Sequence, residues 1–487
     1  MGRAAYQRSE VGDQWTHPRG LSLLHCTIKT SHTRSTPNAE PGTLDWERGT
    51  MNEAYEAHMQ EQTVRIGLAG LGTVGGGLAE ILRENREWIQ KRLGREIRIT
   101  KVLVKDMNKE RDVPPPPDAK LTGSMDELVG DPDIDIVVEL IGGEEAAYNL
   151  ITRALEEGKS VVTANKALLA EHGSELFRLA ADYGAGLAFE ASVAGGIPIV
   201  KTLKESLAGN RIKSLTGILN GTDNYILSEM TDRGISFQDA LGQAQDLGYA
   251  EADPTLDVDG YDAAHKLAVL IRLASGCDYS YSDLPVHGIR GVEAYDINRA
   301  RAFGYRIKLI AQLKDRSGSL QAGVFPALIP EGDILAKVDG PFNAVHIEGD
   351  AVGPVMLYGQ GAGDLPTGSA VLSDIMDLAR GNCHSNTGFV NDALDKADPL
   401  PSELTVSRHY FRFTVQDRPG VLSILSGIMG EHNISIAQVV QKQEPSDEAV
   451  PVVFLTHSAQ LKDVNNALAE IEKLSFIKAP TRHYRIL

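Results

Sequence analysis

The sequence predicts an α/β protein with a doubly wound parallel sheet, a second α+β domain with a mixed sheet, and a small C-terminal α+β module. Three observations support this prediction. The chain has 487 residues, too many for one hydrophobic core. Short apolar segments alternate with amphipathic ones from Thr63 to about residue 200, and the pattern then changes. The stretch DKADPLPSEL at 395–404 has the composition of a linker before a last compact module.

In the first part, short apolar runs that end in glycine or a turn residue predict buried parallel strands. The longer segments with a period near 3.6 predict the helices between them. The run of four prolines at 114–117 indicates a rigid surface loop. The expected strands and helices, in order, are strand 64–70, helix 73–93, strand 97–106, strand 133–143, helix 147–158, a strand leading into a turn and helix at 159–170, and a strand beginning at 186.

After about residue 200 the segments are typical of a more open, mixed sheet with long helices. The expected strands are 211–227, 305–314 and 320–330, and the helices are 236–247 and 260–276. A glycine-rich turn at 359–363 leads into a long helix, which we expect to pack back on the first domain. Residues 408–443 then read as strand, turn, helix, turn and strand. The predicted boundaries are an extension 1–60, domains 61–190 and 191–370, a returning helix and linker 371–400, and a module 405–487.

Composition narrows the class of protein. The net charge of −18 argues against nucleic acid as the main partner, because phosphate binding needs a basic surface. Three widely spaced cysteines, Cys26, Cys277 and Cys383, match no metal-ligand spacing and fit a reducing, cytoplasmic compartment. No apolar run approaches the roughly 18 residues of a membrane span. Residues 1–60 are polar and aperiodic, which predicts disorder, with an over-called start or a transit peptide as alternatives.

The sequence GLGTVG contains Gly70, Gly72 and Gly75 and lies between a predicted strand and a predicted helix. Its glycines allow a tight turn, a close approach to a pyrophosphate, and close helix–strand packing, which together indicate a Rossmann-type dinucleotide site. Lys105 follows the second strand where an NAD-binding chain usually carries an acid, and it would pair with a 2′-phosphate. This favours NADP, but Asp106 could still accept from a ribose, so NAD stays open.

The segment DVDGYDAAHKLAVLIRLA carries the main chemical signal. Asp259 and Asp262 resemble a capping box at the start of a helix. Asp262 and Lys266 are four residues apart and share a face that continues as an apolar stripe, so we expect the pair to be partly buried. An acidic loop with Glu251 and Asp257 precedes them and favours a polar substrate pocket. The alternative is a solvent-exposed helix pair of little energetic weight.

Five motifs together resemble the homoserine dehydrogenase family: GLGTVG, TANK, GILNGT, GYAEADPTLDVDGYDAAHK and GQGAGDLPTGSAV. The resemblance extends from about Thr63 to about Asn391, and the fourth motif is the most specific. Residues 405–487 resemble an ACT domain, a small regulatory fold that binds amino acids. The resemblance implies reversible, NAD(P)-dependent interconversion of L-homoserine and L-aspartate 4-semialdehyde, a step towards threonine, methionine and isoleucine.

The resemblance also implies roles for individual residues. Lys266 would donate a proton to the carbonyl oxygen, with Asp262 and Lys166 as further catalytic residues beside it. Because oxidation of homoserine needs a neutral Lys266, we expect the rate of oxidation to increase at alkaline pH. Substrate would be held by Glu251 and Asp257. Cofactor would contact Gly70, Gly72, Thr73, Val74, Gly75, Lys105, Lys166 and Gly361. A sodium ion would be bound at Glu190, Val193, Gly195 and Ile197, and an effector, expected to be threonine, at Asp417 and Gly420.

Two other functions remain to be compared with this one. An aspartate-semialdehyde dehydrogenase would need a nucleophilic cysteine in a suitable motif, which neither Cys277 nor Cys383 provides. A catalytically inactive, NADP-responsive amino-acid sensor could use the same Rossmann and ACT domains, although the presence of Lys166, Glu251, Asp262 and Lys266 argues against it. By resemblance the second domain also carries oligomerisation, and we expect a homodimer or homotetramer.

Overall fold

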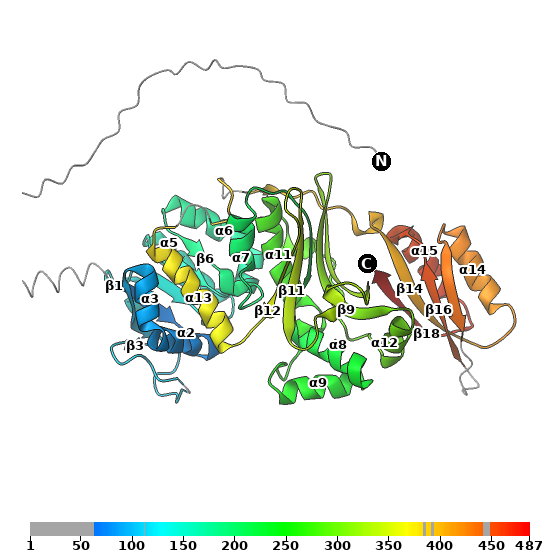
Figure 1. Ribbon diagram of the computed structural model, residues 1–487, viewed down its shortest axis with the longest axis horizontal. Coiled ribbons are helices and arrows are strands. Elements are labelled where there is room, and N and C mark those ends of the chain that lie inside the picture. The colour runs from blue at the N-terminus through cyan, green and yellow to red at the C-terminus, as the bar shows by residue number, and fades with distance from the viewer. Residues whose placement is uncertain (1–62, 112, 383–385, 391–393, 442–448) are drawn as a thin grey trace, which may run out of the picture. The chain divides into compact units, whose positions relative to one another are not determined.

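A computed structural model describes residues 63–487 except 112, 383–385, 391–393 and 442–448 (Figure 1). The expectations for residues 1–60, and for Cys26 and Cys383, lie outside the described residues. Within the described part of the chain, no helix combines the length and the apolar character that crossing a membrane requires.

The predicted doubly wound sheet is confirmed. Its six strands are all parallel and lie in the order β3-β2-β1-β4-β5-β6. This order places the carboxyl ends of β1 and β4 side by side at the switch point where nucleotides bind such sheets. The strands are β1 (Thr63–Ala69), β2 (Glu96–Leu103), β3 (Lys120–Thr122), β4 (Ile136–Glu139), β5 (Ser160–Thr163) and β6 (Leu187–Ala188).

Helices connect most of these strands, as the alternating pattern predicted; among the described residues, only the connection from β2 to β3 contains no helix. They are α2 (Thr73–Glu84), α3 (Arg86–Leu93), α4 (Met125–Val129), α5 (Glu145–Glu156) and α6 (Lys166–Asp182). The single helix expected over 73–93 is two helices, because Asn85 leaves the helical conformation at φ −104° and ψ 15°.

The second domain is built on a large mixed sheet, which confirms that part of the fold class. Along it the strands lie in the order β12-β11-β7-β9-β10-β18-β14-β16-β15. The long hairpin β9–β10 has twelve paired positions and forms the middle of the sheet. The strands of this domain are β7 (Ile212–Ile218), β9 (Tyr305–Arg316), β10 (Ser319–Pro330), β11 (Phe342–Gly349) and β12 (Gly353–Gln360), and a short β8 (Cys277–Asp278) pairs with β13 (Asp395–Lys396).

One strand prediction in this domain is only half right. The segment 211–227 was expected to be a strand throughout, but β7 ends at Ile218 and α8 (Gly221–Arg233) begins three residues later. The Asn220 side chain accepts the backbone N–H of Asp223 and so caps α8. The apolar residues before Asn220 favoured a continuous strand, so the start of this helix was not predicted. The other helices are α7 (Ile199–Lys201), α9 (Phe237–Asp246), α10 (Thr255–Val258), α11 (Tyr261–Ser275) and α12 (Ala294–Ala302).

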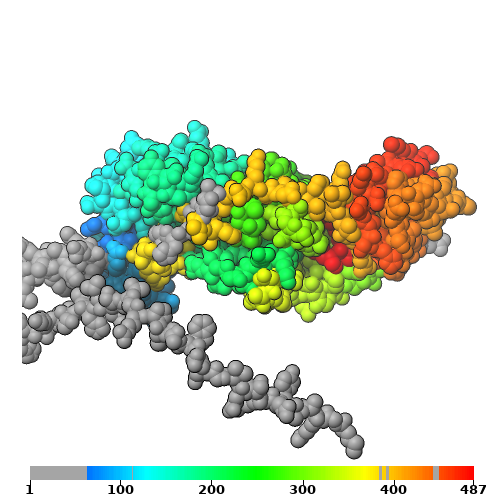
Figure 2. Space-filling model, turned by 90° about the horizontal axis from the view of Figure 1, so that it is seen from above, coloured from blue at the N-terminus to red at the C-terminus, as the bar shows by residue number. Residues whose placement is uncertain are grey.

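The C-terminal module shares its sheet with the second domain. It comprises β14 (Val406–Val415), α14 (Val421–Glu431), β15 (Ile436–Gln441), β16 (Val450–Thr456), β17 (Ala459–Gln460), α15 (Leu461–Ile471) and β18 (Ile477–Ile486). The last strand, β18, pairs with β14 on one side and with β10 on the other, where Ala327 faces Arg485. Figure 2 shows the red C-terminal residues between the green second domain and the orange module. The sequence had suggested a separate unit.

Helix α13 (Asp364–Ala379) lies against α2 of the nucleotide-binding domain, beside it in Figure 1. Its side chains Val371 and Ile375 join the apolar cluster of Ile66 and Leu78. The contact is close enough that a Cβ on Gly77 would overlap the carbonyl of Asp364. The chain thus leaves the second domain at β12 and packs α13 on the first.

Candidate active site

The glycine-rich turn joins β1 to α2. A Cβ on Gly70, whose φ is 98°, would overlap the carbonyl of Leu140, and a Cβ on Gly75 would overlap the carbonyl of Gly70. At Gly72, by contrast, nothing among the described residues lies within 4 Å of the Cβ position. Thr73 and Val74 open α2, and its N-cap residue, Gly72, has no side chain that could cap the helix. Free backbone donors therefore lie beside open space, as a pyrophosphate site requires.

Lys105 and Asp106 follow the carboxyl end of β2, and both are exposed. The Asp106 carboxylate accepts the backbone N–H of Asn108 at 2.8 Å in a local turn. Among the described residues, the Lys105 side chain forms no hydrogen bond or ion pair. The end of β2 therefore presents the Lys105 ammonium without a partner among the described residues, whereas the Asp106 carboxylate already accepts a hydrogen bond from Asn108.

Lys266 and Asp262 are both buried on α11, which confirms the predicted burial and excludes the exposed-pair alternative. The Lys266 Nζ donates to the Asp262 Oδ2 at 2.7 Å and to the carbonyl of Leu219 at 2.7 Å. An ammonium has three protons, so these two bonds leave one for a further acceptor. The Lys266 residue is 9% exposed, so that third donor is shielded from most solvent.

The predicted capping box at this helix is wrong. Gly260, with φ 86°, occupies the N-cap position of α11, and no side chain caps the helix. The Asp259 carboxylate instead pairs with Arg290. The carboxylate of Asp262 is directed to the two lysines and Asn220 rather than back to the helix start.

Asn220 is a central residue that the sequence interpretation missed. Its Nδ2 donates to the Asp257 Oδ1 at 2.7 Å and to the Asp262 Oδ2 at 2.8 Å, while its Oδ1 caps α8. The neighbouring Leu219 carbonyl also accepts from Asn343 at 3.0 Å. One turn between β7 and α8 therefore fixes both carboxylates and the Lys266 ammonium. The GILNGT motif could have indicated this role, because asparagine is a typical N-cap residue at the start of a helix.

Lys166 reaches the same carboxylate from the first domain. It is the first residue of α6, whose N-cap Asn165 accepts the N–H of Leu168. The Lys166 Nζ lies 3.3 Å from the Asp262 Oδ1, and its side chain is 40% exposed. Asp262 therefore contacts one lysine from each domain, where the edge of the parallel sheet meets α11.

Glu139, at the carboxyl end of β4, organises the sheet edge beside Lys166 and was also missed. It accepts from Thr163 at 2.6 Å and from the backbone N–H groups of Ile141 and Gly142. Burial raises the pKa of Glu139, and these hydrogen bonds oppose the shift. The effect is to tie the ends of β4 and β5 and to shape the turn at residues 141–143.

The two carboxylates bound by Asn220 have opposite pKa shifts. Burial opposes ionisation of Asp262, but Lys266, Lys166 and the Asn220 hydrogen bond together hold its pKa well below the usual range. Burial raises the pKa of Asp257, and the neighbouring negative charge of Asp262 raises it further. Asp262 therefore supplies the stable negative charge of the site.

Asp223, in the first turn of α8, is a further carboxyl at this place. It is fully buried, and neither side-chain oxygen has a hydrogen-bond partner among the described residues. Burial raises its pKa well above the ordinary value, and the negative charges of Asp257 and Asp262 add to the shift. An uncharged Asp223 beside the charged cluster is the state that these surroundings favour.

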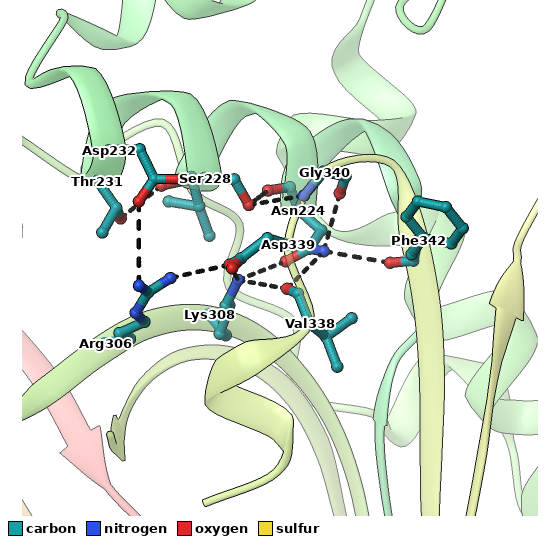
Figure 3. Close-up of polar contacts among 11 residues, drawn as sticks. Asn224, Ser228, Thr231, Asp232, Arg306, Lys308, Val338, Asp339, Gly340 and Phe342 are labelled. Atoms are coloured by element: carbon teal, nitrogen blue, oxygen red, sulfur yellow. Dashed lines mark hydrogen bonds and ion pairs between the residues drawn. The ribbon is translucent and has the colours of Figure 1, made fainter. Parts of the chain in front are cut away.

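Helix α8 is fixed in the second domain by a buried polar network (Figure 3). The Asn224 Nδ2 donates to the carbonyls of Val338, Gly340 and Phe342 at 2.9–3.1 Å. Buried Lys308 donates to the Asn224 Oδ1 at 3.0 Å and to Asp339 at 3.1 Å. The network joins α8 to β9 and to the loop that enters β11, so it supports Asn220 from one turn away.

Of the remaining residues predicted to bind substrate or cofactor, some lie at the site and one does not. Asp257 is half-buried in the cluster, but Glu251 is exposed and its side chain makes no contact with the lysines. Gly361 packs so closely on Asn343 that a Cβ would overlap the amide. The structure thus brings Asp257 to the site and places Gly361 beside one of its supporting residues, but leaves Glu251 in solvent.

The segment proposed for sodium crosses the domain junction. The Glu190 carboxylate accepts the N–H groups of Val200 and Lys201, each at 2.8 Å, so the side chain caps α7. Burial raises the Glu190 pKa to about 7, and the charge of Asp374 adds to this. No hydrogen bond among the described residues ends on the carbonyls of Val193 or Gly195. The described residues hold no cluster of three or more metal-ligating His, Cys, Asp or Glu side chains.

The predicted effector turn lies before α14. Gly420, with φ 89°, precedes the helix, and no side chain caps it. Asp417 is exposed, with its Oδ1 3.4 Å from the Gln441 side chain. The turn thus presents free backbone donors on the surface of the module.

Comparison with known proteins gives consistent matches along the chain. Family models match for the homoserine dehydrogenase NAD-binding domain at residues 70–190, homoserine dehydrogenase at 198–376, and the ACT domain at 409–476. A homoserine dehydrogenase of Neisseria gonorrhoeae is 44% identical over 429 residues, covering 87% of this chain and 98% of that protein.

Solved structures agree with these matches. A homoserine dehydrogenase structure from Thiobacillus denitrificans aligns with a TM-score of 0.80 at 43% identity, over 87% of this chain and 98% of that one. A hyperthermophilic archaeal homoserine dehydrogenase in complex with NADPH aligns at 29% identity with a TM-score of 0.55, over 66% of this chain and 98% of that one.

Proposed function

The chain belongs to the homoserine dehydrogenase family, and from this and the geometry of the site we propose how its residues carry out the reaction. The protein is an NAD(P)-dependent oxidoreductase that acts on a hydroxyl group. Its substrates are L-homoserine and L-aspartate 4-semialdehyde. The single observation that carries the mechanism is the buried Lys266 ammonium, which has two fixed acceptors and one remaining proton.

Lys266 is the acid and base of the reaction. In the reducing direction its third N–H donates to the carbonyl oxygen of the aldehyde and then transfers the proton to the alkoxide that forms. A nicotinamide cofactor held at the glycine-rich turn would supply the hydride chemistry of the reaction. Asp262 and the Leu219 carbonyl orient the ammonium, and burial keeps water from competing as a proton source.

Lys166 and Asp257 complete the site. Lys166 pairs with Asp262 at the sheet edge, where it would lie between the cofactor and the substrate. Asp257, fixed by Asn220, offers an acceptor for the substrate ammonium or hydroxyl. Glu251 is assigned to the substrate ammonium on resemblance alone, and its exposed position requires the loop 249–254 to close over the bound substrate.

NADP is the proposed cofactor. The supporting observation is Lys105 after β2, which is unpaired among the described residues and lies next to Asp106, whose carboxylate accepts the backbone N–H of Asn108. The 2′-phosphate would pair with Lys105, and the pyrophosphate would lie on the N–H groups at Gly72, Thr73 and Val74. Gly361 is assigned to the cofactor through the turn before α13.

A sodium ion is proposed at the turn 190–197. Hard cations take oxygen ligands, and the carbonyls of Val193 and Gly195 carry no hydrogen bond among the described residues. Ala194 and Gly195 both have positive φ, at 55° and 52°, which turns successive carbonyls in different directions. Glu190 and Ile197 would contribute through the same turn, with the Glu190 carboxylate serving as a helix cap.

The ACT domain is proposed to bind threonine as a feedback inhibitor at Asp417 and Gly420, with the ligand carboxylate on the uncapped start of α14. We also propose a homodimer or homotetramer in the cytoplasm. Residues 405–487 include β18, which the second domain needs for its sheet, so effector tests should use point variants such as Asp417→Ala in the full chain.

Initial rates test the proposed function directly. The purified chain is assayed with L-homoserine and NADP or NAD, with and without threonine. Turnover that is faster with NADP and slowed by threonine supports the proposal. A chain that binds NADPH but does not turn over homoserine with either cofactor would instead be the inactive sensor.

A further inference from the structure

A cavity of about 400 Å³ lies where the ACT domain joins the second domain, away from the site around Lys266. Its floor is β18, and its walls come from the start of α15, the segment 285–292 and β10. The volume falls within the range of small-molecule sites. The lining residues are Pro285, His287, Gly288, Gly291, Val292, Phe325, Pro326, Ser402, Leu461, Asn465, Thr481, Arg482, His483, Tyr484 and Arg485.

Arg485 is the unusual side chain of this cavity. Its guanidinium lies over the Phe325 ring, 4.2 Å from the ring centroid. Among the described residues it forms no hydrogen bond and no ion pair, although it is partly buried and burial lowers its pKa. Guanidinium groups withdrawn from water normally have a carboxylate or phosphate partner, because an unpaired charge removed from water is costly.

The neighbouring side chains also favour a carboxylate or phosphate ligand. Thr481, His483 and Arg485 alternate along β18 and so face one side of the sheet. The Thr481 Oγ1 is buried and has no hydrogen-bond partner among the described residues. Among the described residues, no aspartate or glutamate lines the cavity, and Arg482 already donates to Glu293 at 2.7 Å.

The charge of the cavity at neutral pH comes from its arginines. Burial lowers the pKa of His287, and the positive charge of Arg485 lowers it further. Burial also lowers the pKa of His483 well below the ordinary value, and the adjacent His409 adds to the shift. Both imidazoles are therefore neutral hydrogen-bonding groups around a fixed cation.

We propose that this cavity is a binding site for a small carboxylate or phosphate anion that carries no ammonium group, held by the Arg485 guanidinium. The guanidinium can donate two parallel bonds to such an anion, with Thr481 and His483 as further polar contacts. Phe325, Val292 and Leu461 would contact an apolar part of the ligand. A zwitterionic amino acid fits less well, because its ammonium would meet no acidic side chain there.

The cavity wall also contacts α10, the short helix that carries Asp257. The wall segment 285–292 donates from the Ile289 N–H to the carbonyl of Val258 at 2.7 Å. A Cβ on Gly288 would overlap that same carbonyl, so the two backbones are in direct contact. Val258 follows Asp257, which the Asn220 amide holds in the substrate site. A ligand in the cavity should therefore alter the KM for homoserine, a consequence that rests on the proposed function.

Calorimetric titration of the full chain in a buffer free of carboxylate and phosphate tests the site. The probes are inorganic phosphate, pyruvate and L-threonine. At least one of the two anions should bind the wild-type chain with saturable heat, and Arg485→Met should weaken that binding about tenfold or more. Arg485→Lys, which keeps the charge and the strand packing, should retain part of the affinity. The matched control is Arg92→Met, which removes a ring-stacked arginine on α3.

Three results would overturn the binding site: neither anion binds at millimolar concentration, Arg485→Met binds as well as wild type, or L-threonine alone binds through Arg485. The homoserine KM is then measured with and without the anion that binds. An unchanged KM would overturn the link to the substrate site while leaving the binding site intact. Failure to turn over homoserine would reject the proposed function without affecting the calorimetric result.

Discussion

Replacing Lys266 with methionine should remove the proton transfer while leaving the nucleotide site intact. A positioned general acid contributes about 10²–10⁴-fold to a rate, or roughly 2.7–5.4 kcal/mol of activation free energy. We therefore expect kcat for aldehyde reduction to fall by this factor. The affinity for NADPH should change little, because Lys266 lies on α11 and the glycine-rich turn lies between β1 and α2.

The stability cost of the same substitution can be worked out from the partners that remain. Removing one member of a buried ion pair typically costs about 3–5 kcal/mol, because the other charge is left without a partner. Asp262 would keep the Asn220 amide at 2.8 Å and Lys166 at 3.3 Å, and the Leu219 carbonyl would keep Asn343 at 3.0 Å. The loss should therefore be below that range, and the variant should fold.

The assay combines steady-state rates with NADPH binding measured by fluorescence titration. Lys213→Met, at an exposed position of β7, is the matched control and should behave as wild type. The assignment is refuted if Lys266→Met keeps kcat within tenfold of wild type, or if its loss of activity follows entirely from weaker NADPH binding. Circular dichroism of each variant separates a chemical effect from unfolding.

Burial raises the pKa of Asp223 in the folded protein, so the wild type should lose stability as pH rises above about 4, by about 1.4 kcal/mol per pH unit up to the folded-state pKa. Asp223→Asn should not show this loss and should therefore become more stable relative to wild type over that range. Thermal midpoints of the two proteins that stay parallel from pH 5 to 8 would contradict this. Lys105→Glu should raise the KM for NADPH about tenfold or more and change the KM for NADH much less, and equal changes would show that Lys105 does not meet a 2′-phosphate. Asn220→Ala should lower kcat/KM for homoserine by roughly 10–100-fold through misplacement of Asp257 and Asp262, with NADPH affinity retained as the internal control. Gly77→Ala should destabilise the chain, whereas Gly242→Ala, a helical glycine with nothing within 4 Å of its Cβ position, should not; equal thermal midpoints would show that the contact between α2 and α13 adapts.

The features that the sequence predicted correctly depend only on residues close together in the chain. The glycine spacing at 70–75 and the apolar run before it specify a strand, a turn and a helix without reference to the rest of the chain. The spacing of Asp262 and Lys266 places both on one helix face, and the apolar residues of that face predicted their burial.

The features that the sequence did not predict depend on distant segments. Asn220 lies 42 residues from Asp262 and 37 from Asp257, so its role exists only after β7 and α11 have packed together. The pairing of β18 with β10 likewise joins segments more than 150 residues apart. The exposed position of Glu251 was not predicted for a related reason. A motif gives the order of residues, but not the conformation of the loop that carries them or its exposure to solvent.

The two lysines of the site come from different domains, so their separation depends on what holds those domains together. The Lys166–Asp262 pair is too weak to do this, since an ion pair with one partner 40% exposed contributes at most about 1 kcal/mol. Backbone contacts are stiffer. A Cβ on Gly195 would overlap the carbonyl of Gly361, as one on Gly77 would overlap that of Asp364. These close backbone contacts, possible only at glycine, hold the turn at 361–364 against Gly77 of the first domain and against Gly195, and so restrict relative movement of the parts that carry Lys166 and Lys266.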